Sequence, residues 1–213
     1  MANILNALLV IILMLNLFTL GTSRIQSIIR TVAIQGVLLG FLPLVVHEHL
    51  TLPVILAASA AIILKGFVIP IMMSHALRDA QIKREVNPLI GNLPSIVLGA
   101  LATVFALLFA SQMPLADANL SKLIVPSAIA TILIGFILLT TRFKALTQVI
   151  GYLILENGIF IFGVLLMEAM PMVVEMGVLL DLFVGIFVSC IIISKINQSF
   201  SSMDTRILSS LKE

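Results

Sequence analysis

Four polar or ionisable side chains lie near the middles of four separate apolar stretches of this chain: Gln35, Lys65, Glu156 and Asp181. Three of them can carry a charge. A charged side chain at the centre of a bilayer costs about 2.5–3.5 kcal/mol on insertion scales, so each needs a structural or functional reason. The pattern favours a polar track, or a set of paired charges, inside a membrane-embedded helix bundle.

The lysine and the two carboxylates are expected to meet inside the protein. The side chain of Lys65 is about 6 Å long, too short to reach an interface ~15 Å away, so its ammonium must be paired or solvated internally. Tyr152 lies one turn before Glu156 on the same helical face, within hydrogen-bonding reach of the carboxyl. Gly177 and Gly185 lie one turn to either side of Asp181 and would let another helix approach it closely.

Two interpretations of these charges stay open. In the first, a lysine and a carboxylate in a surrounding of low dielectric constant form a relay, and a neighbouring charge shifts a proton between them. In the second, Lys65 permanently neutralises one acid as a structural tie and the other acid stays protonated. Gln35 fits a hydrogen bond to a neighbouring helix better than a role in conduction.

The composition explains where these residues must lie. Hydrophobic residues make up 61% of the chain and charged residues only 10%, and the mean hydropathy is +1.23. A soluble domain of 213 residues could not cover so much apolar surface with so few charges. The apolar stretches are long and lack period-2 alternation, so we predict an all-α integral membrane protein.

Seven apolar stretches, each close to the length of a membrane-spanning helix, are present at about residues 4–20, 29–46, 53–73, 93–111, 123–140, 146–166 and 172–194. The first lacks a basic leader and a cleavage site, so we expect it to be a mature helix. We predict one transmembrane domain over residues 1–195, with possible halves 1–74 and 92–195 joined by a loop over 75–91. A tail follows over residues 196–213.

Basic residues predict the orientation of these helices. Of the 12 Lys and Arg residues, Lys65 lies within a span, Lys122 lies in one set of connectors, and the remaining ten lie in the alternate connectors or the tail. The positive-inside rule therefore predicts an external N-terminus, a cytoplasmic loop 75–91 and a cytoplasmic tail. An odd number of spans agrees with this orientation.

The sequence contains no signature of a catalytic centre. The single cysteine, Cys190, cannot hold an iron–sulfur cluster, and the chain has no glycine-rich phosphate loop, CxxC or HExxH motif. His47-Glu48-His49 is better interpreted as a polar turn than as a metal site, because no third ligand accompanies it in the loop. We expect no catalytic residue, metal or cofactor in this chain.

Several segments resemble a known family, the hydrogenase-4 component E membrane subunits. The most specific is Gln148 to Gly158, which includes Tyr152, Glu156 and Asn157; the others are Glu175 to Asp181, Ala57 to Met72, and Met203 to Lys212. That family is related to subunit K of respiratory complex I, in which buried glutamates in successive helices lie on an ion-transfer axis. The resemblance places Glu156 at the first of these positions by its motif and Asp181 at the second by its depth, whereas Gln35 replaces the acid in the N-terminal half.

The resemblance implies a membrane-arm subunit of a group 4 NiFe hydrogenase or a formate hydrogenlyase-like complex in a prokaryotic plasma membrane. Its partners would be antiporter-like subunits, a membrane anchor subunit and peripheral hydrogenase subunits, and these would carry the NiFe and iron–sulfur centres. The leading hypothesis is that Glu156, Asp181, Lys65, Tyr152 and Gln35 contribute to a proton or sodium pathway. The alternatives are a scaffold subunit that conducts no ions and a stand-alone carrier.

Overall fold

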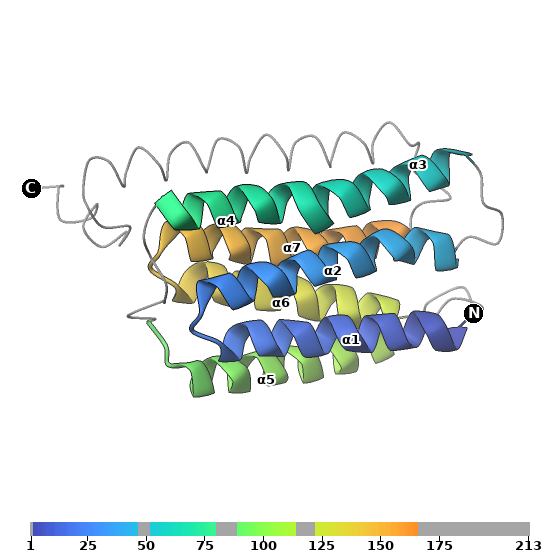
Figure 1. Ribbon diagram of the computed structural model, residues 1–213. Coiled ribbons are helices and arrows are strands. Elements are labelled where there is room, and N and C mark those ends of the chain that lie inside the picture. Colours follow the sequence, from blue (N-terminus) through green and yellow to red (C-terminus); the bar gives the residue numbers. More distant parts are fainter. Residues whose placement is uncertain (1, 47–51, 80–88, 114–121, 166–213) are drawn as a thin grey trace, which may run out of the picture.

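The computed structural model describes residues 2–46, 52–79, 89–113 and 122–165, and its described secondary structure is a bundle of helices (Figure 1). The elements are α1 (Ala2–Gly21), α2 (Ile25–Val46), α3 (Leu52–Ala61), η1 (Ile62–Val68), α4 (Ile69–Asp79), α5 (Asn92–Ser111), α6 (Ile124–Thr141) and α7 (Ala145–Leu165). In apolar surroundings a helix satisfies its own backbone hydrogen bonds, which is why these apolar sequences adopt it. The predicted all-α membrane architecture is confirmed for the described residues.

The described part contains six helices that are long and apolar enough to cross a membrane. Elements α3, η1 and α4 follow one another directly and count as one of these helices, called the rod below. Six predicted spans therefore have counterparts in the structure. The rod extends to Asp79, beyond residue 74, where the first half was predicted to end. The predicted span 172–194 and the tail 196–213 lie outside the described residues.

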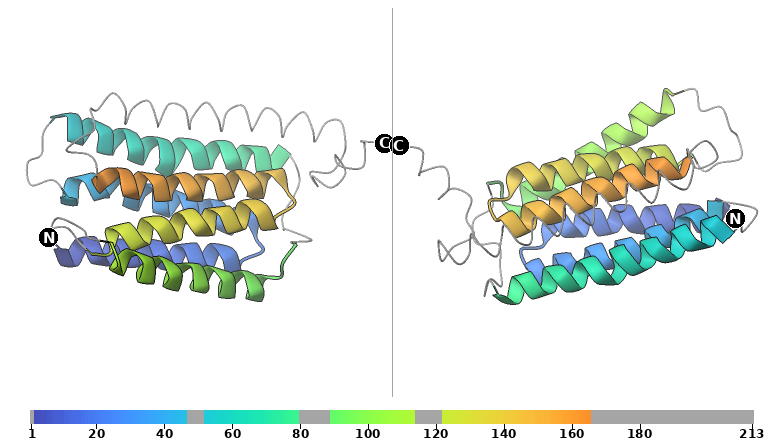
Figure 2. Two further views of the ribbon diagram at one scale, coloured as in Figure 1. Left: turned by 180° about the vertical axis from the view of Figure 1, so that it is seen from behind. Right: turned by 90° about the horizontal axis from the view of Figure 1, so that it is seen from above.

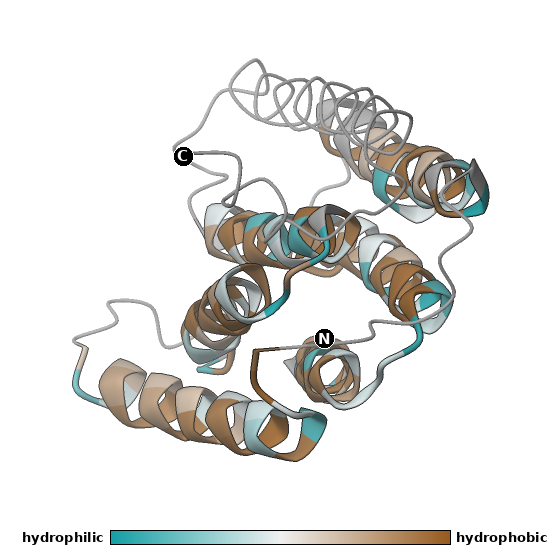
Figure 3. Ribbon diagram, turned by 90° about the vertical axis from the view of Figure 1, so that its left-hand side faces the viewer, coloured by the Kyte–Doolittle hydropathy of each residue, from teal (hydrophilic) through white to brown (hydrophobic). Residues whose placement is uncertain are grey.

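The helices lie side by side along one direction (Figures 1 and 2). Helix α5 lies at an edge of the described bundle, where it packs on α1 and α6, whereas α2 packs on α1, α7 and the rod. Viewed end-on, hydrophobic residues extend along the helices, and hydrophilic residues appear at their ends (Figure 3). This is the distribution expected of a membrane-spanning bundle.

Two clusters of buried apolar residues form the core. The first apolar cluster lies toward the ends of the helices at the α1–α2 and α6–α7 turns and comprises Leu20, Ile25, Ile28, Ile29, Val32, Ile69, Met73, Leu77, Ile134, Leu138, Leu146, Ile150, Leu153 and Ile154. The second lies toward the opposite ends and comprises Leu5, Leu9, Ile12, Leu39, Leu42, Ala61, Ile124, Ala128, Phe160, Ile161 and Val164. Helices α1, α2, α6, α7 and the rod each contribute to both clusters.

Arg142 ties the two halves of the bundle together. It was counted among the basic connector residues, but its side chain is buried, and Nη2 donates a hydrogen bond of 3.1 Å to the carbonyl oxygen of Leu20. Helix α1 has no basic residue in its own last turn. A cation near the unpaired carbonyls of a helix C-terminus is stabilising, so Arg142 caps α1 from the α6–α7 turn.

Candidate functional site

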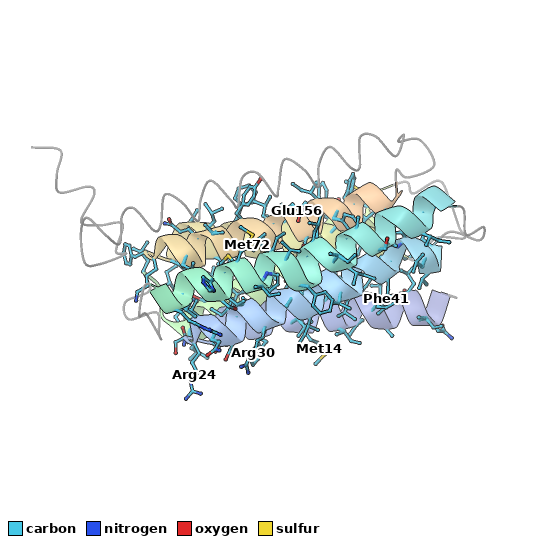
Figure 4. The ribbon with its side chains drawn as sticks, turned by 45° about the horizontal axis from the view of Figure 1, so that its top comes forward. Met14, Arg24, Arg30, Phe41, Met72 and Glu156 are labelled. Atoms are coloured by element: carbon cyan, nitrogen blue, oxygen red, sulfur yellow. The ribbon has the colours of Figure 1, made fainter. Side chains whose placement is uncertain are left out.

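The rod and α7 bring Lys65 and Glu156 together as a buried ion pair. Lys65 Nζ lies 2.5 Å from Glu156 Oε1 and 2.7 Å from Oε2, so the ammonium donates to both carboxylate oxygens. The side chains are only 3% and 6% exposed. Figure 4 labels Glu156 on α7, with the rod beside it. The two charges therefore neutralise each other away from solvent, where their attraction is stronger than at a surface.

Phe160 supplies a second contact to the lysine. It lies one turn after Glu156 in α7, and Lys65 Nζ is 4.4 Å from the centroid of its ring. A desolvated ammonium over an aromatic face gains about 2 kcal/mol. The carboxylate of Glu156 and the ring of Phe160 both belong to α7, so the Lys65 ammonium is held against this helix.

The backbone around Lys65 is a π-helix rather than an α-helix. Segment η1 covers Ile62–Val68, and the N–H of Ile69 donates to the carbonyl of Leu64, five residues earlier. The next donor in this pattern would belong to residue 70, which is proline and has no N–H, so the pattern cannot continue onto the Lys65 carbonyl. Short π segments within α-helices occur frequently at functional sites.

Two glycines set the positions of the helices that carry the pair. A Cβ on Gly36 would lie 2.6 Å from the carbonyl carbon and oxygen of Lys65, so α2 touches the lysine backbone directly. A Cβ on Gly158 would lie 2.7 Å from the backbone nitrogen of Ile132 in α6. No larger residue fits either contact without movement, because real Cβ atoms do not approach backbone atoms this closely.

Gln35 does not join the ion pair but links α2 to α1. Its Nε2 donates to Asn16 Oδ1 at 2.7 Å and to the carbonyl oxygen of Ile12 at 3.3 Å. Asn16 Nδ2 in turn donates to Thr131 Oγ1 of α6 at 2.8 Å. This is the helix-linking arrangement that the sequence favoured for Gln35.

These polar residues form a single layer between the two apolar clusters. In α1, α2, the rod, α6 and α7, the residues of the first apolar cluster are separated from those of the second by one or two buried polar residues. The polar layer consists of Asn16 in α1, Gln35 in α2, Lys65 in the rod, Thr131 in α6, and Glu156 and Asn157 in α7, and all six are buried. The ion pair is therefore part of a polar cross-section near the middle of the bundle.

Tyr152 differs from its predicted arrangement. Its side chain is 43% exposed, and the described residues include no hydrogen bond between it and Glu156. The predicted hydrogen bond between Tyr152 and the Glu156 carboxylate is therefore not formed in the structure. Asp181 lies outside the described residues, so its predicted place beside the pair remains a prediction.

Four residues of this region were not singled out in advance as site residues: Asn16, Thr131, Asn157 and Phe160. Asn16 is a strongly polar residue in the interior of the apolar stretch 4–20, and Asn157 directly follows Glu156, so the sequence marks both as unusual positions. Thr131 and Phe160 are ordinary residues of membrane helices, and only the packing reveals their contacts. Within the described part of the chain, no group of three His, Cys, Asp or Glu residues could hold a metal ion.

Comparison with known proteins finds two kinds of relative. The uncharacterized protein Rv0085 of Mycobacterium tuberculosis is 30% identical over 193 residues, which cover 89% of this chain and 87% of that protein. Hydrogenase-4 component E of Escherichia coli is 25% identical over 155 residues, which cover 73% of this chain and 72% of that protein. The Shigella flexneri protein of the same name gives the same values. No family model and no solved structure matches the chain.

Proposed function

Because this chain belongs to the family of the Mycobacterium tuberculosis protein Rv0085 and is distantly homologous to hydrogenase-4 component E, we propose that it is a membrane subunit of a hydrogenase complex. Six apolar helices and a low content of charged residues support a multi-pass membrane location. We assign that location to the plasma membrane of a prokaryote. The NiFe and iron–sulfur centres would reside in partner subunits of a group 4 or formate hydrogenlyase-like complex.

Within that complex, the ion pair of Lys65 and Glu156 contributes to coupling between redox chemistry and the movement of protons or sodium ions. The burial of this pair is the observation that carries the proposal. Apolar residues of similar volume are often as stabilising as a buried ion pair, or more so. Stability alone is therefore a weak reason to maintain two charges here, whereas a charge-dependent step requires them.

The geometry allows one simple charge-dependent step. A proton can move from the Lys65 ammonium to the Glu156 carboxylate along their hydrogen bond, which converts an ion pair into two neutral groups. In surroundings of low dielectric constant, the balance between these forms responds strongly to any nearby charge. A charge that appears next to the pair would shift the balance between the ionic and the neutral form. We assign this neighbouring charge to Asp181, which would change its own charge when it takes up or releases an ion.

The scaffold alternative also has a structural observation in its favour. Helix α5 is the least buried of the six apolar helices. Its exposed side chains include Leu93, Val97, Leu101, Val104, Phe105 and Leu108. Such a face suits lipid or a helix of an antiporter-like or anchor subunit, and this contact would need no ion movement through the chain.

Purification from native membranes in a mild detergent tests the assignment to a complex. We expect the tagged full-length chain to co-purify with membrane and peripheral hydrogenase subunits in fixed proportion. A chain that purifies alone and transports ions by itself in liposomes would instead be a stand-alone carrier, and the proposal would be wrong.

A further inference from the structure

The polar layer contains two buried amide atoms without a hydrogen-bond partner, on helices that pack against each other. Gln35 Nε2 is fully engaged with Asn16 and Ile12, and its Oε1 has no partner. Asn157 Nδ2 in α7 also has none, and both residues are at most 2% exposed. The first atom is an acceptor and the second a donor. Buried polar atoms are normally satisfied, so the pair of orphans needs an explanation.

The two atoms belong to the same level of the bundle. Helices α2 and α7 are in contact and run in the same direction (Figure 1). On the side of the polar layer that holds the first apolar cluster, one small cavity lies between α2, α7 and α4. Ile29 and Val32 of α2 and Ile150 and Leu153 of α7 line it, together with residues of α4. Gln35 lies one turn after Val32 and Asn157 one turn after Leu153. The seam between α2 and α7 is therefore incompletely filled by side chains one turn before these two amides.

We propose that a buried water molecule binds between α2 and α7, donating a hydrogen bond to Gln35 Oε1 and accepting one from Asn157 Nδ2. Water can donate and accept at once, as this pair of orphans requires. A metal cation could bind Gln35 Oε1 but could not accept from the Asn157 amide, and an anion could not donate to Gln35. The apolar cavity below the layer offers no polar partner and stays dry.

This water joins Thr131, Asn16, Gln35 and Asn157 of the polar layer into one hydrogen-bonded chain. Asn16 and Thr131 lie on its α1–α6 side, and Asn157 directly precedes the turn that carries Phe160 over Lys65. The presence of the water does not depend on the proposed function, but its role in proton exchange does. Amide side chains do not readily exchange protons, whereas a water molecule in the same polar layer as Glu156 can do so.

A structure of the full-length protein in lipid, at a resolution that shows ordered water, tests the site directly. We expect a density peak within hydrogen-bonding distance of both Gln35 Oε1 and Asn157 Nδ2. An empty seam would overturn the proposal, as would a direct contact between the two amide groups. This measurement needs no substitution, so it does not depend on whether a variant folds.

Hydroxyl-radical labelling by X-ray pulses gives a second readout, because radicals form at bound water and oxidise the side chains beside it. Phe160 lies one turn after Asn157 in α7, so we expect the N157L variant to lower its labelling rate several-fold. The matched control is T19V, which removes a buried hydroxyl that bonds only within α1 and should leave the rate unchanged. Unchanged labelling in N157L would overturn the proposal. If the water is present while substitution of Glu156 leaves coupling intact, the site stands and the proposed function fails.

Discussion

At the scale of single residues, the two buried charges of the site, on Lys65 and Glu156, form one ion pair. The Lys65 ammonium donates to both carboxylate oxygens of Glu156 and also lies over the ring of Phe160. Each charge is therefore compensated by the other, and the ring adds a further contact to the ammonium. Removing one partner of a buried pair leaves the other uncompensated, at a cost of about 3–5 kcal/mol. Removing both charges avoids that penalty.

The K65M variant should therefore be strongly destabilised, because the Glu156 carboxylate would remain buried without its counter-ion. We expect a clear fall in melting temperature and in yield of assembled protein, corresponding to about 3–5 kcal/mol. Adding E156Q should restore most of this loss. The matched control is K122M, which removes an exposed lysine and should change neither quantity. A K65M protein as stable as the parent would contradict the buried pairing.

At the scale of helices, the position of the ion pair depends on how α2 meets the rod. Gly36 touches the backbone of Lys65 inside the π segment, so any side chain there must push the lysine away from α2. Overpacking of this kind typically costs about 1–3 kcal/mol. By contrast, a Cβ added to Gly163 in α7 would have no other atom within 4 Å.

A comparison of G36A with G163A isolates this contact. We expect G36A to lower the melting temperature and to disturb the pair of Lys65 and Glu156. G163A should be neutral or slightly stabilising, because alanine is the better helix former by about 1 kcal/mol. Thermal unfolding of both purified variants provides the measurement. Equal behaviour of the two would show that the close approach of α2 to Lys65 has no energetic importance.

The sequence predicted the elements better than their contacts. Long apolar runs such as 93–111 gave the helices almost residue by residue, because helix formation in apolar surroundings depends mainly on length and hydropathy. The π segment was not predictable, because the apolar pattern of its own residues does not distinguish a π-helix from an α-helix, and its contact with Gly36 comes from another helix. The Lys65 side chain had two candidate carboxylates in sequence, and only the packing of α7 against the rod shows its contact with Glu156. Tyr152 illustrates the same limit, because helical spacing does not fix which way a ring points.

At the scale of the whole molecule, the polar layer divides the core into two apolar halves across the bundle. If the helices cross the membrane, this layer lies parallel to the membrane plane, which is the orientation that the proposed lateral coupling between subunits would need. Within the described residues, the other charged side chains lie at or near the ends of the helices. Figure 4 labels Arg24 and Arg30 near one end of the bundle: Arg24 lies in the turn between α1 and α2, and Arg30 lies in the second turn of α2.

The orientation of the bundle is tested by labelling single cysteines in a C190S background. A membrane-impermeant maleimide added to intact cells should label K122C and leave K83C unlabelled, because the basic connectors are predicted to face the cytoplasm. Permeabilised cells provide the control, since both positions should then react. The reverse pattern would place the N-terminus inside the cell and overturn the predicted orientation.

The central claim is that the ion pair serves coupling rather than assembly, and the K65M/E156Q double variant tests it most directly. Neither charge remains, yet no charge is stranded, so the complex should assemble. We predict that membrane vesicles with this complex keep the hydrogenase subunits in normal proportion, but that the number of ions pumped per hydrogen molecule turned over falls at least about tenfold. Ion pumping and hydrogen turnover at parental levels in the fully assembled double variant would contradict the account and leave the pair as a structural tie.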